Sequence, residues 1–198
     1  MKPIVSVLIA TRGRVHRCVE SIESICKTAT TGNFEILLRI DRDDTETLNN
    51  IHLLTHKKVS HIVIGDRYQG YVSHSTFMDE LVGLAKGEWL FFLDDDGVII
   101  GQGWDEQLAE VPKHGKIVHP EFYWLGESHY GSGSCDPVAI CVPYKCWEQY
   151  WGPGLRHPND MWLQNMLTEK GWTNHLLTGI IAYHKRDDEE TLAQHRKL

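Results

Sequence analysis

The chain has 198 residues, of which 41% are apolar and 24% charged, and this composition is ordinary for a globular protein with a sizeable core. Its formal net charge of −7 argues against a nucleic-acid polymer as partner, because a surface that binds many phosphates needs an excess of lysine and arginine. The apolar run near the amino terminus stops at Thr11, too soon for a membrane span, so we expect a cytoplasmic protein without an integral membrane segment.

Strands and helices are predicted to alternate through the first half of the chain. Apolar residues at helical spacing predict helices at 15–26, about 43–55 and 73–86, with Gly87 ending the last. Continuous apolar runs predict buried strands at 4–10, 35–40, 61–65 and 89–93. Because this alternation favours right-handed crossovers, we expect an α/β fold with a mostly parallel central sheet flanked by helices.

The second half has a less regular pattern, rich in glycine and aromatic residues. The sequence predicts helices at 104–111, 145–150 and 159–170, extended segments at 116–118, 138–142 and 180–183, and a Gly/Ser-rich loop at 130–136. No repeat, linker or low-complexity segment interrupts the sequence, so we expect one domain over residues 1–198.

Three adjacent carboxylates, Asp94, Asp95 and Asp96, follow the predicted strand at 89–93 and precede Gly97. Buried next to one another, such anions lose hydration and repel each other unless a cation lies among them. Mg²⁺ and Mn²⁺ prefer oxygen ligands and often bind substrate phosphates as well. This acidic triplet therefore predicts a metal-dependent site for a phosphorylated ligand. The alternative is an acidic turn, since aspartate is common in turns beside glycine.

Polar residues also follow the first two predicted strands. Thr11, Arg12 and Arg14 come after the first strand, and Asp41 and Asp43 after the second. The carboxyl ends of parallel strands share one edge of a sheet, and ligands bind beyond that edge. We therefore expect these residues and the acidic triplet to lie together.

The order of these motifs resembles a known family. The chain has Thr-Arg-Gly-Arg after the first strand, Asp after the second, then Gly-Glu-Trp-Leu-Phe-Phe-Leu-Asp-Asp-Asp, and later Asn-Asp on a helix. This resembles the GT-A glycosyltransferases, most closely the inverting family 2 type, which transfer a sugar from a nucleotide-diphosphate sugar. The resemblance covers the first half well and the second half at isolated positions. It implies a Rossmann-like GT-A fold with a nucleotide-binding half at about 1–100 and an acceptor-binding half at about 101–198.

The resemblance implies roles on the donor side. Asp41 would hydrogen-bond the base, Asp94 would face the ribose or the metal, and Asp96 would ligate a Mn²⁺ or Mg²⁺ ion that bridges the two phosphates, as in the DXD motif of the family. The nucleotide-sugar-binding set implied here is Thr11, Arg12, Arg14, Asp41, Asp43, Asp94 and Asp95.

On the acceptor side, inverting transfer needs a base that takes the proton of the attacking hydroxyl group. The family usually supplies an aspartate from a Glu-Asp pair, which falls here on Asn159-Asp160, so Asp160 is the implied catalytic base. The alternative is that either residue only caps a helix. We expect Asn159, and Trp151 in a Trp-Gly-Pro-Gly loop, to contact a carbohydrate or other hydroxyl acceptor.

His184 follows the last apolar segment, and the resemblance implies that it is a third metal ligand, although one of 12 histidines can equally be a bystander. The sequence thus predicts a metal-dependent glycosyltransferase. Two alternatives remain open at this point, a nucleotidyltransferase and a catalytically silent module that binds a sugar or nucleotide.

Overall fold

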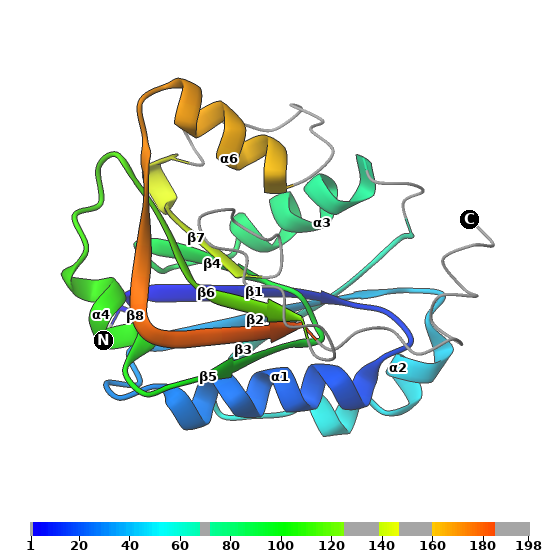
Figure 1. The fold of residues 1–198 in the computed structure, drawn as a ribbon. Coiled ribbons are helices and arrows are strands. Elements are labelled where there is room, and N and C mark those ends of the chain that lie inside the picture. The colour runs from blue at the N-terminus through cyan, green and yellow to red at the C-terminus, as the bar shows by residue number, and fades with distance from the viewer. Residues whose placement is uncertain (1, 68–71, 125–138, 147–159, 185–198) are drawn as a thin grey trace.

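A computed structural model describes residues 2–67, 72–124, 139–146 and 160–184. Its helices are α1 (Val15–Thr28), α2 (Thr45–Asn49), the 3₁₀ helix η1 (Ile51–Leu54), α3 (Val72–Val82), α4 (Trp104–Glu110) and α6 (Asp160–Glu169). Its strands are β1 (Val5–Thr11), β2 (Phe34–Asp41), β3 (Val59–Gly65), β4 (Trp89–Leu93), β5 (Gly97–Ile100), β6 (Lys116–Trp124), β7 (Ala139–Pro143) and β8 (Thr173–His184). The strands form one eight-stranded sheet in the order β3-β2-β1-β4-β7-β6-β8-β5 (Figure 1).

The sheet is mixed, so the prediction of a mostly parallel sheet was wrong. Strands β3, β2, β1 and β4 are parallel to one another. Beyond β4, the β4–β7, β7–β6 and β8–β5 pairs are antiparallel, and β6–β8 is parallel. Parallel neighbours need long crossover connections, which the first half supplies through α1 and through α2 with η1. The regular alternation of strands and helices ends after β4, and antiparallel pairing begins there.

Most predicted elements of the first half are confirmed with small shifts at their ends. The predicted helix at 43–55 is divided into α2 and η1, and α3 ends at Val82 rather than at 86. Gly87 lies further on, where the chain comes very close to β1: a Cβ there would be 2.4 Å from the backbone nitrogen of Ser6. The predicted Gly/Ser-rich loop and most of the predicted helix at 145–150 lie outside the described residues.

The core lies on both faces of the sheet, because successive residues of a strand point to opposite sides. Val7 and Ile9 of β1 pack in the cluster that contains Ile22 of α1, whereas Leu8 packs with Leu81 of α3. Figure 1 shows α1 on one side of the sheet and α3 and α6 on the other. All five residues of β4 are buried, as expected of a strand covered on both faces.

Strand register brings the chemically interesting residues together. Thr11 pairs with Ile40, one residue before Asp41. On the other side of β1, Leu8 pairs with Phe92, so the end of β1 runs level with the acidic triplet. In the described part of the chain, no helix is long and apolar enough to cross a membrane.

Candidate functional site

Two carboxylates of the acidic triplet are bound by residues at the end of β1, in the loop that follows and at the start of α1. The Thr11 hydroxyl donates to Asp95 Oδ2 at 2.6 Å, and Arg14 binds Asp95 through Oδ1. Arg14 Nη1 also donates to Asp96 Oδ2 at 2.9 Å, and Arg17 Nη1 lies 3.8 Å from the same oxygen. Asp95 and Asp96 are each 1% exposed. Positive side chains therefore balance these buried charges, as burial of an anion requires.

The triplet also forms a turn, as the structural alternative predicted. The backbone N–H of Gly97 donates to the carbonyl of Asp94 at 3.0 Å, which directs the chain into β5. A turn alone does not account for the burial of the next two carboxylates, because turn residues usually lie at the surface. The ion pairs with Arg14 give these two side chains a second role.

Burial changes the acidity of Asp95. Removal from water raises the pKa of Asp95 to about 6, and the neighbouring charge of Asp96 adds to this effect. The attraction of Arg14 and the hydrogen bond from Thr11 lower the pKa of Asp95, but burial outweighs them. A cation added near this carboxylate would favour its ionised form.

At the end of β2, a second cluster surrounds Asp41. Arg12 Nη1 donates to Asp41 Oδ2 at 2.9 Å and to Asp43 Oδ1 at 2.5 Å, while Arg12 Nη2 donates to Asp43 Oδ2 at 3.2 Å. The hydrogen bond to Asp43 is the main cause of the raised pKa of Arg12, and the same bond lowers the pKa of Asp43. Asp41 itself is 5% exposed, and its Oδ1 is bound by Arg39.

Gly13 separates the two arginines of the β1 loop and fixes the loop to α2. Its φ of +63° lies in the left-handed region, which glycine adopts without strain. Its N–H donates to Asp44 Oδ2 at 2.9 Å and to the Thr47 hydroxyl at 3.2 Å. Asp44 Oδ1 also accepts from the Thr47 N–H at 3.1 Å and so caps α2. As a result, Arg12 reaches towards β2 and Arg14 towards β4.

Only some of the predicted ligands of a divalent cation have side chains that the structure describes. Thr11 and Arg14 bind both oxygens of Asp95, and Arg14 also binds Oδ2 of Asp96, so a divalent cation would compete with Arg14 for Asp96. The backbone of His184 pairs with Gly97 in the β5–β8 ladder, so the chain brings this residue next to the triplet, but its side chain lies outside what the structure describes. Within the described residues, no group of three or more metal-ligating side chains is assembled.

Three predicted acceptor-side residues remain predictions. Asp160 is the first residue of α6, and its side chain is not among those described. Trp151 and Asn159 lie outside the described residues.

Sequence reasoning missed two arginines of the site. Arg39 lies near the end of the fully buried strand β2 and is 1% exposed, so an arginine in such a run was itself a signal. Arg17 gave no comparable signal, because a charged residue on an amphipathic helix is ordinarily solvated.

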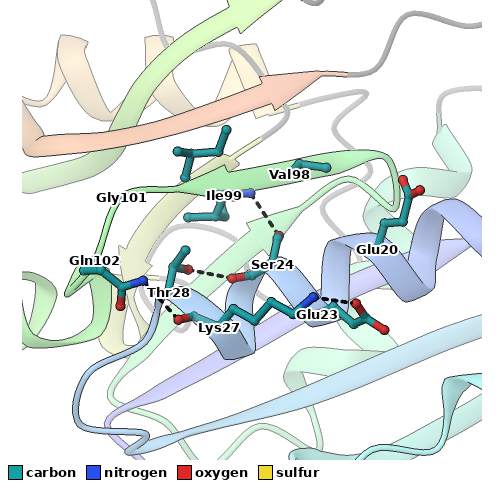
Figure 2. Close-up of a pocket in the computed structure, with 10 residues that line it drawn as sticks. Glu20, Glu23, Ser24, Lys27, Thr28, Val98, Ile99, Gly101 and Gln102 are labelled. Atoms are coloured by element: carbon teal, nitrogen blue, oxygen red, sulfur yellow. Dashed lines mark hydrogen bonds and ion pairs between the residues drawn. The ribbon is translucent and has the colours of Figure 1, made fainter.

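A separate cavity of about 450 Å³ lies between α1 and β5. Two of its polar side chains bind each other, since Lys27 pairs with Glu23 at 2.8 Å, and the Ser24 hydroxyl accepts the backbone N–H of Ile99 at 2.9 Å (Figure 2). Among the described residues, those of the acidic triplet and its arginine partners do not line this cavity. We therefore place the candidate site at the strand ends and not here.

No protein-family model matches the sequence, and no curated protein matches it. Solved structures do match the fold. The mannosyltransferase PcManGT from Pyrobaculum calidifontis, in complex with GDP-Man and Mn²⁺, aligns over 98% of this chain and 60% of its own, with a TM-score of 0.70 and 13% identity. GalNAc-T7 with UDP, GalNAc and Mn²⁺ aligns over 95% of this chain and 45% of its own, with a TM-score of 0.75 and 13% identity.

Residues 1–349 of S. aureus TarS align over 93% of this chain and 60% of that structure, with a TM-score of 0.68 and 15% identity. The chain thus spans between 45% and 60% of the length of these three structures. At this identity the similarity concerns the fold. The α/β GT-A fold predicted from the order of the sequence motifs is therefore confirmed.

Proposed function

We propose that this protein is a metal-dependent glycosyltransferase that moves a sugar from a nucleotide-diphosphate sugar to a hydroxyl acceptor. One observation carries the proposal: the Arg12–Asp41 and Arg14–Asp95–Asp96 clusters lie at neighbouring strand ends of a GT-A fold. This is the edge at which open α/β sheets bind ligands. Solved structures with this fold contain GDP-Man with Mn²⁺ or UDP with Mn²⁺.

In the proposed complex, each of the two clusters binds a different part of the nucleotide sugar. Asp41 accepts a hydrogen bond from the base, with Arg12 and Asp43 beside it at the rim. Thr11 and Arg14 line the ribose side, next to Asp95. The close pairing of Arg12 with Asp41, at 2.9 Å, supports a common role for the two residues.

A divalent cation, Mn²⁺ or Mg²⁺, is proposed to be held by Asp94 and Asp96, with His184 as a third ligand. Carboxylate oxygens suit both ions, and imidazole suits Mn²⁺. When bound, the cation supplies electrostatic stabilisation of the negative charge that develops on the departing diphosphate. Asp95 keeps its bonds to Thr11 and Arg14 and so holds the β1 loop next to this position.

On the acceptor side, we propose that Asp160 is the catalytic base and that the reaction inverts the anomeric carbon. Asp160 takes the proton of the acceptor hydroxyl, whose oxygen bonds to the anomeric carbon as the bond to the diphosphate breaks on the opposite face. Trp151 and Asn159 are proposed to contact the acceptor. This division corresponds to one domain over 1–198, with a nucleotide half at about 1–100 and an acceptor half at about 101–198.

A panel of nucleotide sugars tests the proposal. The purified protein with Mn²⁺ is expected to bind at least one nucleoside diphosphate and to release it from the matching nucleotide sugar, slowly with water and faster with an acceptor. Chelation of the metal with EDTA should abolish turnover. If no member of the panel binds or reacts with Mn²⁺ present, the proposed function is wrong. Pyrophosphate release from a nucleoside triphosphate would instead indicate a nucleotidyltransferase.

The substitution Asp160→Asn separates binding from catalysis. It is expected to leave the nucleoside diphosphate Kd unchanged and to reduce transfer by about 10²-fold or more, because general base catalysis contributes about that much. Glu169→Gln, at the exposed end of the same helix, is the matched control and should transfer at the parental rate. Equal activity of Asp160→Asn and the parent protein would contradict the assignment of the base.

A further inference from the structure

We infer that Arg39 is a positioning residue that fixes the carboxylate of Asp41 for recognition of the donor base. The inference rests on the proposed function, since it assumes that Asp41 reads a base. Arg39 lies near the end of β2, two residues before Asp41, and is 1% exposed. Arginine is almost never fully buried unless its charge is paired, so each contact of this guanidinium group is informative.

Three different segments hold the Arg39 guanidinium group. Arg39 Nη1 binds Asp41 Oδ1, Nε donates to Glu80 Oε2 of α3 at 3.1 Å, and Nη2 donates to the backbone carbonyl of Asp66 after β3. The Phe77 ring of α3 lies beneath the group, with its centroid 4.3 Å from Cζ. Because the guanidinium group is planar and its N–H groups have a fixed geometry, these contacts determine its orientation.

Asp41 is consequently bound from two sides that differ in exposure. Arg39 binds Oδ1 from the interior, whereas Arg12, with a side chain 38% exposed, binds Oδ2 from the rim. The rim arginine can rearrange when a ligand enters, and the interior arginine cannot do so without breaking its other contacts. A carboxylate has about four lone-pair sites, so Asp41 can still accept an N–H group from a base. Arg39 therefore determines where that acceptor points.

Gly65 provides the space for this arrangement. A Cβ at Gly65 would lie 2.7 Å from Arg39 Nη2 and 3.0 Å from Glu80 Oε2. The φ of Gly65 is not positive, so its backbone conformation does not require glycine. Glycine is required here because the Arg39 guanidinium group comes so close. Gly65→Ala should therefore displace Arg39 without removing a charge.

The first test is Arg39→Lys, which keeps the positive charge but cannot bind three partners in one plane. The matched control is Arg42→Lys, whose parent side chain is exposed and pairs with Asp66 Oδ1 at 2.9 Å without contacting Asp41. Dissociation constants for UDP, GDP, ADP and CDP are measured with Mn²⁺, together with thermal unfolding. We expect the ratio between the weakest and the tightest Kd to fall about tenfold in Arg39→Lys, which corresponds to loss of about one oriented hydrogen bond. Arg42→Lys should keep the parental ratio.

Gly65→Ala is the second test, and it decides the outcome if Arg39→Lys does not fold. The same fall in base selectivity is expected, since the guanidinium group must move. Equal weakening of all four nucleotides would indicate a purely structural role and overturn the inference, as would unchanged selectivity in both variants. If the parent protein binds none of the four nucleotides, the proposed function fails as well. Selective binding by the parent with unaltered selectivity in the variants overturns only the role of Arg39.

Discussion

At the residue scale, the carboxylate of Asp95 is almost completely buried. Because of this burial, the stability of the protein should depend on pH. Burial raises the pKa of Asp95 from 3.8 to about 6. Between these two values the folded state binds more protons than the unfolded state, so this residue makes stability fall as pH rises from about 4 to 6. The lost stability is at most about 3 kcal/mol for a shift of roughly two pKa units.

Asp95→Asn should remove this part of the pH dependence. The measurement is the free energy of unfolding in urea at pH 4.5 and 7, compared between the variant and the parent protein. Asp43→Asn is the control, because Asp43 is exposed and Arg12 lowers its pKa, which gives any contribution the opposite sign. A decline from pH 4.5 to 7 that is as large in Asp95→Asn as in the parent would contradict the prediction.

The sequence predicts individual residues of the site where an acidic or basic residue directly follows a predicted strand. Their partners could not be predicted, because a pairing such as Arg14 with Asp95 depends on side-chain directions across two strands. The triplet was predicted to face a metal ion, yet arginines neutralise two of its carboxylates in the described structure. The sequence pattern does not distinguish these two sources of positive charge.

At the element scale, α4 stabilises the loop between α1 and β2. Asp105, which is 2% exposed, accepts hydrogen bonds from the N–H groups of Thr30, Thr31 and Gly32 at 2.8 to 3.0 Å and from the Thr31 hydroxyl at 2.6 Å. The neighbouring Trp104 donates through Nε1 to the carbonyl of Ile25 at 3.2 Å. The loop that leads into β2 is therefore held by one buried carboxylate.

Asp105→Ala should destabilise the protein by about 3 kcal/mol, because it leaves several donors of this loop without their acceptor. Urea unfolding measures the change. The control is Glu106→Ala, since Glu106 lies in the same first helical turn but is exposed. Nucleotide affinity should not change, because the loop enters β2 at the end opposite to Asp41. Similar stabilities of the two variants would show that the loop does not depend on Asp105.

The elements of the first half were predictable because each has its own periodicity. Helix α1 and strands β1 and β4 follow from apolar spacing within a few residues of the observed bounds. Strand β5 was missed because it has only four residues and lies at the edge of the sheet, where Ser24 of α1 accepts one of its N–H groups. The pairing of β6 with β8 joins distant parts of the chain, which local periodicity does not encode.

At the scale of the whole molecule, the sheet divides into a parallel part and a part with both orientations. The parallel strands β1, β2 and β4 position the candidate donor site, and this part of the architecture was predictable from the alternation of strands and helices. The placement of His184 next to Gly97 was not, because it results from the antiparallel pairing of β8 with β5 at the sheet edge. The fold class was thus predicted correctly, whereas the order and direction of the strands in the second half of the sheet were not.

The central position of β1 also sets the distance between the two clusters of the candidate site. Asp41 follows the strand on one side of β1, and the acidic triplet follows the strand on the other side. Neighbouring strands are spaced about 4.8 Å apart, so the backbones that carry the two groups lie roughly 10 Å apart across the sheet. A free phosphate or a lone nucleobase is too short to touch both, whereas a molecule with a base at one end and two phosphates at the other covers that span. In the proposed complex, the sheet spacing would therefore exclude ligands too short to contact both groups.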